Sequence, residues 1–302
     1  MTTESQQATV HLGLPKGRMH DNVIKLMSEA GISLKKSARG YRPDITLEGF
    51  EVKILKPQNI VTMLAAGTRD AGFAGADWVS ELSAEIAGHD HELVELLDTK
   101  MDPVRIVVAA PRESVLDSRF PAPKDGRPLR VASELEQVSK QWIARTGLDA
   151  RFVRTYGATE VFPPEDADMI IDVTQTGATL EANGLVIIDD VMTSATRLYA
   201  SSRALDVPEK RRKLEELVVL LSSVLDARGR VLIDMNVAED QLEALVKVLP
   251  CMREPTVSRL HAQRGYAVRV AAPQKDLPRL VPLIKQHGGS DIVVSQVQQV
   301  VP

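Results

Sequence analysis

The sequence predicts an α/β protein with more than one domain, and three observations support this class. Short apolar segments typical of strands alternate with segments of helical periodicity through most of the chain. After Gly229 the predicted order is strand, helix, strand, strand, helix, strand. With 302 residues, 44% of them apolar, the chain can build two or three cores.

The composition argues against several classes of protein. Aromatic residues make up only 4% of the chain, too few for the base-stacking platforms of single-stranded nucleic-acid binders, and the net charge of −4 argues against a general nucleic-acid or membrane-surface partner. Cys251 is the only cysteine, so we expect a packing residue there and neither a disulfide framework nor a cysteine-based zinc site. The segment MTTESQQATV lacks the pattern of a signal peptide, and no segment approaches the roughly 20 apolar residues of a membrane span. We therefore expect a soluble, cytoplasmic protein.

Strands and helices alternate in the first third of the chain. Three apolar segments predict strands: TVHLGLP (9–15), FEVKILK (50–56) and AGFAG (71–75). Helical spacing predicts helices over residues 21–30 and 59–66, which end at Gly31 and Gly67. The segment VRIVVAAP (104–111) predicts a strand that is buried on both faces.

The middle of the chain repeats this alternation. LRVAS (129–133) leads into a helix for which Ser133 and Glu136 have the spacing of a capping box, and Gly147 ends that helix. Three further strands follow: ARFVRTY (150–156), ADMIIDV (167–173) and LVIIDD (185–190). The composition changes over residues 102–103 and 190–194, which indicates two crossings between lobes.

A long amphipathic helix, VPEKRRKLEELVVLLSSVL (207–225), precedes the last unit. Its basic run over residues 210–213 resembles a nuclear signal, but we interpret it as a solvated face with i,i+4 pairs between Arg211 and Glu215 and between Arg212 and Glu216. The last unit has strands and helices at residues 230–237, 239–248, 256–262, 266–272, 275–287 and 291–297. This βαββαβ order predicts a ferredoxin-like module.

The segment DVTQTGATLEANGL (172–185) is the first candidate site. It follows a predicted strand and precedes a helical pattern, so its free amides can bind a phosphate. Gly177 allows close approach of the backbone, and Thr174, Thr176 and Thr179 add hydroxyl groups. Asp172 can accept hydrogen bonds from sugar hydroxyls. The alternative is an ordinary strand–turn–helix junction with a threonine cap.

Two other segments are weaker candidates. In LPKGR (14–18), Lys16 and Arg18 flank Gly17, which suits a diphosphate, although a basic turn has the same composition. In RDAGFAGADWVSE (69–81), Gly72 and Gly75 bracket the end of a strand and Asp77 is placed to cap the next helix. A tight turn is the alternative there.

Other features give little support for a site. His89, Asp90 and His91 have no third ligand nearby, so we expect a solvated loop. The P-loop pattern is absent, which argues against phosphoryl transfer from ATP in that mode.

In order and spacing, these segments resemble the ATP phosphoribosyltransferase family in its long form. LKPQNIVTMLAAGTRDAGFAGAD is similar to the family's second block, and MREPTVSRL to a segment of the long form's third domain. The segment GATEVFPPEDADMIIDVTQTGATLEANGL is similar to the family signature, on the following positions: Glu160, Asp172, Thr176, Gly177, Thr179 and Leu180. The chain departs from the pattern at Asp166, where the signature has a glycine, and in GFAGAD, where a G-I-T-G-like run is usual.

The resemblance implies a fold and a domain division. The catalytic part is expected to be two-lobed, like a periplasmic binding protein, and to be followed by a ferredoxin-like regulatory domain. Lobe I would comprise residues 1–103 and 191–227, lobe II residues 104–190, and the regulatory domain residues 228–302. The resemblance further implies Mg²⁺ as cofactor and a hexameric assembly.

The resemblance also implies a reaction, in which N1 of ATP attacks C1 of phosphoribosyl diphosphate and diphosphate leaves. The attacking nitrogen carries no proton, so positioning and electrostatics are needed more than a strong base. The loop that would hold the 5′-phosphate contains Thr174, Gln175, Thr176, Gly177, Ala178 and Thr179.

The remaining roles are implied in the same way. Asp172 and Glu160 would hold ribose hydroxyls, while Lys16, Arg18 and Lys56, with Gly17 and Mg²⁺, would stabilise the leaving diphosphate. The block that shapes the ATP side contains Asp70, Gly75 and Asp77.

Regulation and two alternatives complete the expectations. Asp234 and Thr256 match positions near a histidine inhibitor in the last domain. One alternative is a two-lobed binding module for a small phosphorylated ligand without turnover. The other is a phosphoribosyltransferase with a different acceptor.

Overall fold

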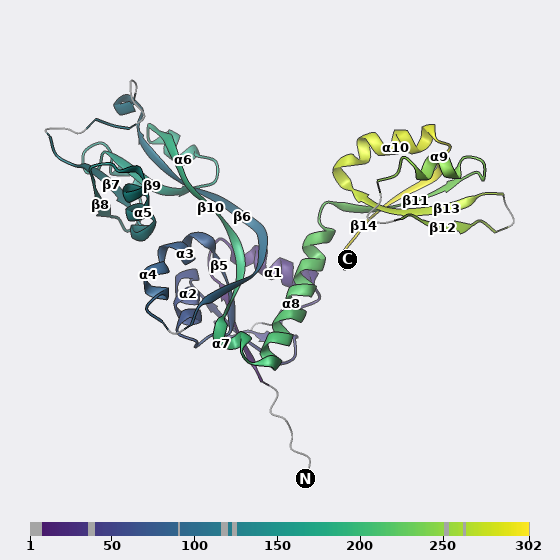
Figure 1. Cartoon of the computed structure of the whole chain (residues 1–302), viewed down its shortest axis with the longest axis horizontal. Coiled ribbons are helices and arrows are strands. Elements are labelled where there is room, and N and C mark those ends of the chain that lie inside the picture. Colours follow the sequence, from purple (N-terminus) through teal and green to yellow (C-terminus); the bar gives the residue numbers. More distant parts are fainter. Residues whose placement is uncertain are drawn as a thin grey trace, which may run out of the picture. The chain divides into compact units, whose positions relative to one another are not determined.

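The computed structural model describes residues 8–35, 40–89, 91–115, 120–122, 126–250, 254–261 and 264–301. It divides into two compact units, which are described separately (Figure 1). The first comprises residues 1–28 and 32–218, and the second comprises residues 29–31 and 219–302. Cys251 and Asp90, interpreted above, lie outside the described residues.

An eight-stranded mixed sheet organises the first unit. Its order is β4-β1-β5-β10-β6-β9-β7-β8. The strands are β1 (Val10–Pro15), β4 (Phe50–Leu55), β5 (Ala71–Gly75), β6 (Leu93–Pro111), β7 (Leu129–Ser133), β8 (Ala150–Arg154), β9 (Met169–Thr174) and β10 (Leu185–Ser201). A separate two-stranded sheet pairs β2 (Leu34–Lys35) with β3 (Asp44–Ile45).

Two long strands make this unit two-lobed. β6 has 19 residues and β10 has 17, and they pair antiparallel from Leu185↔Pro111 to Ser201↔Leu93 with several register shifts. At one end β10 pairs with β5, and near the other end β6 pairs with β9, so the same two strands serve both lobes (Figure 1). This confirms the predicted two-lobed arrangement of the unit.

The strands predicted from the sequence, over residues 104–111 and 185–190, are shorter than the observed β6 and β10. Polar residues interrupt the outer parts of both strands, for example Lys100 and Asp102, which have positive φ angles of 55° and 50°. Pairing between segments far apart in the chain keeps these parts extended, and composition does not reveal such pairing.

The helices of the first unit are short except for the first, the fifth and the last. They are α1 (His20–Glu29), α2 (Pro57–Ala65), α3 (Ala76–Glu81), α4 (Ser83–Ile86), α5 (Glu136–Thr146), α6 (Ala178–Ala182), α7 (Ser202–Leu205) and α8 (Pro208–Ala227), which continues into the second unit. Single 3-10 turns occur at Arg112–Val115 and Thr159–Val161. Gly13 and Gly72 let Ile60 of α2 pack closely on the sheet, because a Cβ on Gly72 would lie 2.4 Å from its side chain.

The capping box predicted for α5 does not form. Ser133 Oγ accepts the amide of Leu135, and the Glu136 carboxylate binds Lys140 and Arg154, so neither side chain caps the helix reciprocally. Three amides of the first turn instead donate to Glu81 of α3, at 2.7, 2.9 and 3.1 Å. A carboxylate from another element thus replaces the local cap, which local spacing could not reveal.

The basic run of α8 is only partly solvated, contrary to the prediction. Arg212 pairs with Glu216 at 2.5 Å on an exposed face, as expected. Lys210 Nζ, however, lies 2.7 Å from the buried Asp70 carboxylate, and the buried Lys213 donates to the Ala8 carbonyl at 3.0 Å. These two lysines therefore hold α8 to the sheet.

The second unit is ferredoxin-like, as predicted. Its elements are β11 (Arg230–Val237), α9 (Leu242–Val246), β12 (Thr256–Arg259), β13 (Tyr266–Pro273), a 3-10 turn (Gln274–Asp276), α10 (Leu277–Gln286) and β14 (Ser290–Gln296). The antiparallel order is β12-β13-β11-β14, and both helices lie on one face of this sheet (Figure 1). On β11, every second side chain from Val231 to Val237 is buried under the helices. α9 is shorter than the predicted 239–248.

Within the part of the chain that the structure describes, no helix is both long enough and apolar enough to cross a membrane.

Candidate active site

One pocket of the first unit gathers most of the predicted site residues. It has a volume of about 480 Å³, within the range of small-molecule sites. Its lining consists of Arg18, Asp77, Trp78, Val104, Glu160, Asp172, Val173, Thr174, Gln175, Thr176, Ala178, Thr179 and Leu180. The weak signals of three separate segments therefore meet at one place.

The threonine-rich loop leaves β9 and turns sharply at Gly177. This glycine has φ +84°, and it donates its amide to Thr174 Oγ1 at 2.8 Å. Thr176 Oγ1 accepts the Ala178 amide at 3.3 Å. The following helix α6 has only five residues, so a helix dipole contributes little here, and the loop's hydroxyls and amides are its main donors.

Acidic residues set the electrostatics beside this loop. Burial, together with the nearby charges of Glu160 and Glu134, raises the pKa of Asp172 to about 6, although its carboxylate accepts the Val173 amide at 2.7 Å. The like charges make a neutralising partner favourable at this position. Donors from a bound sugar or a divalent cation would meet that requirement.

Asp77 enters the pocket from the other lobe and is held firmly. Its carboxylate accepts Ser194 Oγ at 2.6 Å, and its amide donates to the same oxygen at 3.0 Å. The prediction that Asp77 caps α3 is wrong. The helix starts after Gly75, and Asp77 lies within its first turn. Gly75 is required by this packing, since a Cβ there would lie 2.1 Å from the Asp77 carboxylate.

The two cations of the LPKGR segment face different surroundings. Gly17, with φ +87°, separates them. Arg18 lines the pocket described above, whereas Lys16 lies in a neighbouring depression with Gly17, His20 and Tyr41. Lys16 Nζ donates to Tyr41 Oη at 3.3 Å and lies 5.2 Å from the centre of that ring.

The predicted site residues Lys56 and Asp70 line neither this pocket nor the neighbouring depression. Lys56 is exposed at the start of α2. Asp70 is 7% exposed, and its carboxylate binds Lys210 Nζ at 2.7 Å and the His11 amide at 2.7 Å. These contacts give Asp70 a role in holding α8, and its place on the ATP side stays a prediction.

The two residues predicted to bind histidine lie close together in the second unit. Asp234 of β11 and Thr256 of β12 are both register partners of Arg269 on the strand between them. The Asp234 carboxylate accepts from Arg269 Nε at 2.6 Å.

Sequence reasoning missed several residues around the pocket. Trp78 and Val104 line it, and Ser194 positions Asp77. Trp78 directly follows Asp77 and is one of only two tryptophans, so its position was a usable signal. Ser194 and Glu81 gave no signal, because their partners are more than 50 residues away in the chain.

The described acidic side chains of the pocket do not form a closed metal site. Among the residues that the structure describes, no group of three His, Cys, Asp or Glu side chains is arranged to hold an ion. Mg²⁺ commonly uses only one or two carboxylates and completes its shell with water and substrate phosphates. Asp172 with Glu160 fits that mode of binding but not a closed protein cage.

Comparisons with known proteins agree on one family. The sequence profile described as ATP phosphoribosyltransferase matches residues 56–223, and that of its C-terminal domain matches residues 227–299. The ATP phosphoribosyltransferase of Pelotomaculum thermopropionicum is 35% identical over 97% of this chain and 99% of its own length. That of Chlorobaculum parvum is 34% identical over 93% of this chain and 94% of its own.

A solved structure supports the fold of the first unit. A chain of the ATP phosphoribosyl transferase (HisG:HisZ) complex from Thermotoga maritima matches with a TM-score of 0.61 and 22% identity, covering 72% of this chain and 99% of that one.

Fold and pocket together define a two-lobed α/β transferase with a threonine-rich loop in its site and a ferredoxin-like unit after it. The chain belongs to the ATP phosphoribosyltransferase family, in the long form with the additional C-terminal domain. It is a transferase of histidine biosynthesis.

Proposed function

We propose that this protein transfers the phosphoribosyl group of phosphoribosyl diphosphate to N1 of ATP and releases diphosphate. The observation that carries the proposal is the pocket in which the loop from Asp172 to Leu180 faces Arg18 and Asp77 of the other lobe. The loop supplies hydroxyls and amides for a phosphate, and Arg18 supplies a cation on the opposite side.

In this mechanism the protein positions two substrates and stabilises charge. Attack by an unprotonated nitrogen requires no general base, and the developing charge lies at C1 and on the departing diphosphate. The amides around Gly177 and the hydroxyls of Thr174, Thr176 and Thr179 hold the 5′-phosphate, while Asp172 accepts ribose hydroxyls with Glu160 beside it. Lys16, Arg18 and Lys56 act on the diphosphate, and Gly75, Asp77 and Asp70 belong to the ATP side.

Mg²⁺ belongs to this proposal as an ion that enters with the substrate. It would neutralise part of the diphosphate charge, and Asp172 with Glu160 would hold it. The raised pKa of Asp172 supports a role for a cation there, because a neighbouring positive charge offsets the repulsion from Glu160.

The decisive experiment measures diphosphate release from phosphoribosyl diphosphate with ATP and, separately, with other nucleotide or base acceptors. Release with ATP alone supports the proposed reaction. Release with another acceptor but not with ATP would assign a different phosphoribosyltransferase. Binding of phosphoribosyl diphosphate with no release under any condition would assign a binding module.

We propose that histidine inhibits the enzyme through the second unit. The ligand's ammonium would pair with Asp234 and its carboxylate with Arg269, and Thr256 would add a hydroxyl. The support is that these three side chains lie on neighbouring strands at matched register.

The proposal includes the domain bounds and the assembly. Lobe I comprises residues 1–103 and 191–227, lobe II residues 104–190, and the regulatory domain residues 228–302. The enzyme is expected to be a cytoplasmic homo-oligomer, a hexamer by family membership.

A further inference from the structure

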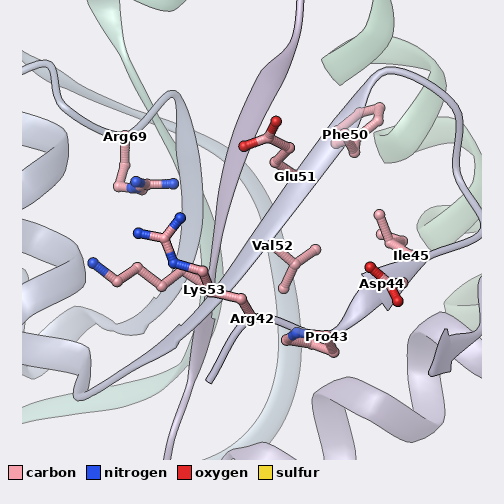
Figure 2. A pocket seen from close by; sticks show the side chains of 9 residues that line it. All are labelled: Arg42, Pro43, Asp44, Ile45, Phe50, Glu51, Val52, Lys53 and Arg69. Atoms are coloured by element: carbon pink, nitrogen blue, oxygen red, sulfur yellow. The ribbon is translucent and has the colours of Figure 1, made fainter. Parts of the chain in front are cut away.

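A second cavity lies on the first unit, and none of its lining residues belongs to the candidate active site. It has a volume of about 500 Å³ beside β4, which is the edge strand of the sheet. The residues that line it are Arg42, Pro43, Asp44, Ile45, Phe50, Glu51, Val52, Lys53 and Arg69 (Figure 2).

Three cations from three segments gather at one end of this cavity. Figure 2 shows the guanidinium groups of Arg42 and Arg69 facing each other, with the ammonium of Lys53 beside them. None of the three side chains forms a hydrogen bond or ion pair with another residue that the structure describes. Grouping like charges is unfavourable unless an anion lies between them.

Arg69 has a further unmet requirement. Its Nε is sealed from solvent and has no hydrogen-bond partner among the described residues. A sealed donor that lacks a partner loses free energy relative to the same donor in water. An acceptor bound in the cavity beside the Arg69 guanidinium would supply its partner.

The acids of the cavity do not neutralise this end. The Glu51 carboxylate lies 3.6 Å from His11 Nε2, and Asp44 lies at the other end, beside Ile45 (Figure 2). Three cations and the single acid Glu51 leave a net charge of about +2, which matches a phosphate dianion better than a carboxylate.

We propose that the cavity bounded by Arg42, Lys53 and Arg69 is a binding site for a phosphate group, separate from the catalytic pocket. The two guanidinium groups provide paired donors for phosphate oxygens, and Lys53 provides a further positive charge. The ligand is either free inorganic phosphate or the phosphate of a small phosphomonoester.

The test is calorimetric titration of the full chain with inorganic phosphate at constant ionic strength and neutral pH. Because the threonine-rich loop is also expected to bind phosphate, wild type and Gly177→Val are both titrated. In both proteins, Arg69→Gln and Arg42→Gln should weaken binding at the second site by about tenfold or more. Glu51→Gln should strengthen it, because that change removes the nearest acid.

Matched controls separate a site from general charge. Arg145→Gln removes an exposed cation elsewhere and should leave phosphate binding unchanged, as should Asp44→Asn at the far end of the cavity. Thermal melts establish that each variant is folded. If an arginine variant does not fold, Lys53→Gln is titrated in its place. A second titration with AMP identifies the source: tighter binding than inorganic phosphate, lost in Arg69→Gln, assigns a phosphomonoester.

Equal phosphate affinity in wild type and the folded Arg69→Gln or Lys53→Gln variant overturns the proposal. Crystals soaked in selenate provide an independent measurement, with an anomalous peak expected between the three cations. A peak without titratable binding in solution would mean an adventitious ion only, and would also overturn it.

Discussion

At the scale of single residues, Asp172 links stability and activity through its pKa. Burial and the neighbouring acids raise this pKa from 3.8 to about 6, so folding favours the protonated carboxyl. The contribution of this raised pKa to the free energy of unfolding is fully present below pH 3.8 and is lost as the pH rises through 6. Asp172→Asn should therefore raise the free energy of unfolding at pH 8 by about 1 kcal/mol, allowing for solvent screening, and leave it unchanged near pH 3.

Activity should show the opposite dependence on pH. The ionised carboxylate is the form that accepts sugar hydroxyls or holds a cation, so kcat/KM of the wild type should rise with pH through about 6. Denaturant melts at two pH values test the first expectation, and a pH profile of kcat/KM tests the second. An Asp172→Asn variant that is less stable than wild type at pH 8 would contradict the assigned environment.

Gly177 is the second residue whose role can be isolated. A Cβ at this position would contact only Ile187 Cδ1, at 3.5 Å, so the constraint is the φ of +84° and not crowding. Gly177→Val should cost roughly 1–2 kcal/mol of stability through strain. It should also reduce turnover by roughly 10²–10³-fold, the usual effect of losing one anion donor.

Gly177→Asn is the matched control, because asparagine tolerates this backbone region. It should keep the stability while still obstructing the phosphate. Rates from single-turnover assays, compared with melting temperatures, separate the two effects. Wild-type rates for both Gly177→Val and Thr176→Ala would remove the loop from the site.

Lys16 allows a test of charge with little structural cost. Its side chain is exposed, and among the described residues its hydrogen bond and its ring contact are both with Tyr41. Lys16→Ala should lower kcat/KM while the melting temperature stays within a few degrees, since exposed substitutions usually change stability by about 0.5 kcal/mol or less. Tyr41→Phe removes the hydrogen bond and keeps the charge, and it should remain active. Loss of activity that follows only from unfolding of Lys16→Ala would contradict the assignment.

At the scale of elements, the contact between α3 and α5 joins the two lobes. Glu81 ends the short helix that carries Asp77 and Trp78, and it accepts three amides of α5. Burial raises the pKa of Glu81 because it disfavours the ionised carboxylate. The three amides and the charge of Arg154 partly offset this effect. Glu81→Ala should cost about 1–3 kcal/mol, because it leaves buried amides without an acceptor.

Glu136 provides the matched control for this prediction. It occupies the place of the expected capping box but binds only Lys140 and Arg154 on the surface. Glu136→Ala should change stability far less than Glu81→Ala, and it should leave KM for phosphoribosyl diphosphate unaltered. Glu81→Gln should raise that KM, because the two sides of the pocket are then less firmly joined. Equal destabilisation by the two alanine variants in chemical denaturation would contradict the cross-lobe cap.

At the scale of the whole molecule, the catalytic and ferredoxin-like units should be separable in function. All the described residues that line the catalytic pocket belong to the first unit. Asp234→Ala should keep turnover unchanged in the absence of histidine and relieve inhibition by histidine. Coupling between the sites is expected to be about 1–3 kcal/mol, or roughly 5–150-fold in affinity.

Two measurements check this regulatory prediction. The first compares histidine inhibition of wild type and Asp234→Ala in steady-state assays, and the second repeats the assay after removal of residues 229–302. The shortened protein should transfer the phosphoribosyl group and ignore histidine. Inhibition of Asp234→Ala as strong as that of wild type would place the regulatory site elsewhere.

Local chemistry was sufficient to predict much of the molecule. Most of the longer strands and helices, the end of α5 at Gly147, the ferredoxin-like unit and the turn at Gly177 follow from periodicity and from glycine's access to positive φ. These features depend on residues within a few positions of one another, so the sequence alone determined them. The hydroxyl groups that the loop from Asp172 to Leu180 carries are also read directly from the sequence, whereas their binding of phosphate stays a prediction.

Tertiary structure decided the features that depend on partners far along the chain. Lys210 pairs with the buried Asp70, Glu81 caps α5, Ser194 holds Asp77, and β6 and β10 continue through polar segments. Each contact joins residues more than 50 positions apart, and the energy that fixes it comes from desolvation and pairing in the folded state. The sequence therefore determined which groups are available for phosphate chemistry, whereas the fold decided which of them share a pocket and which hold the lobes together.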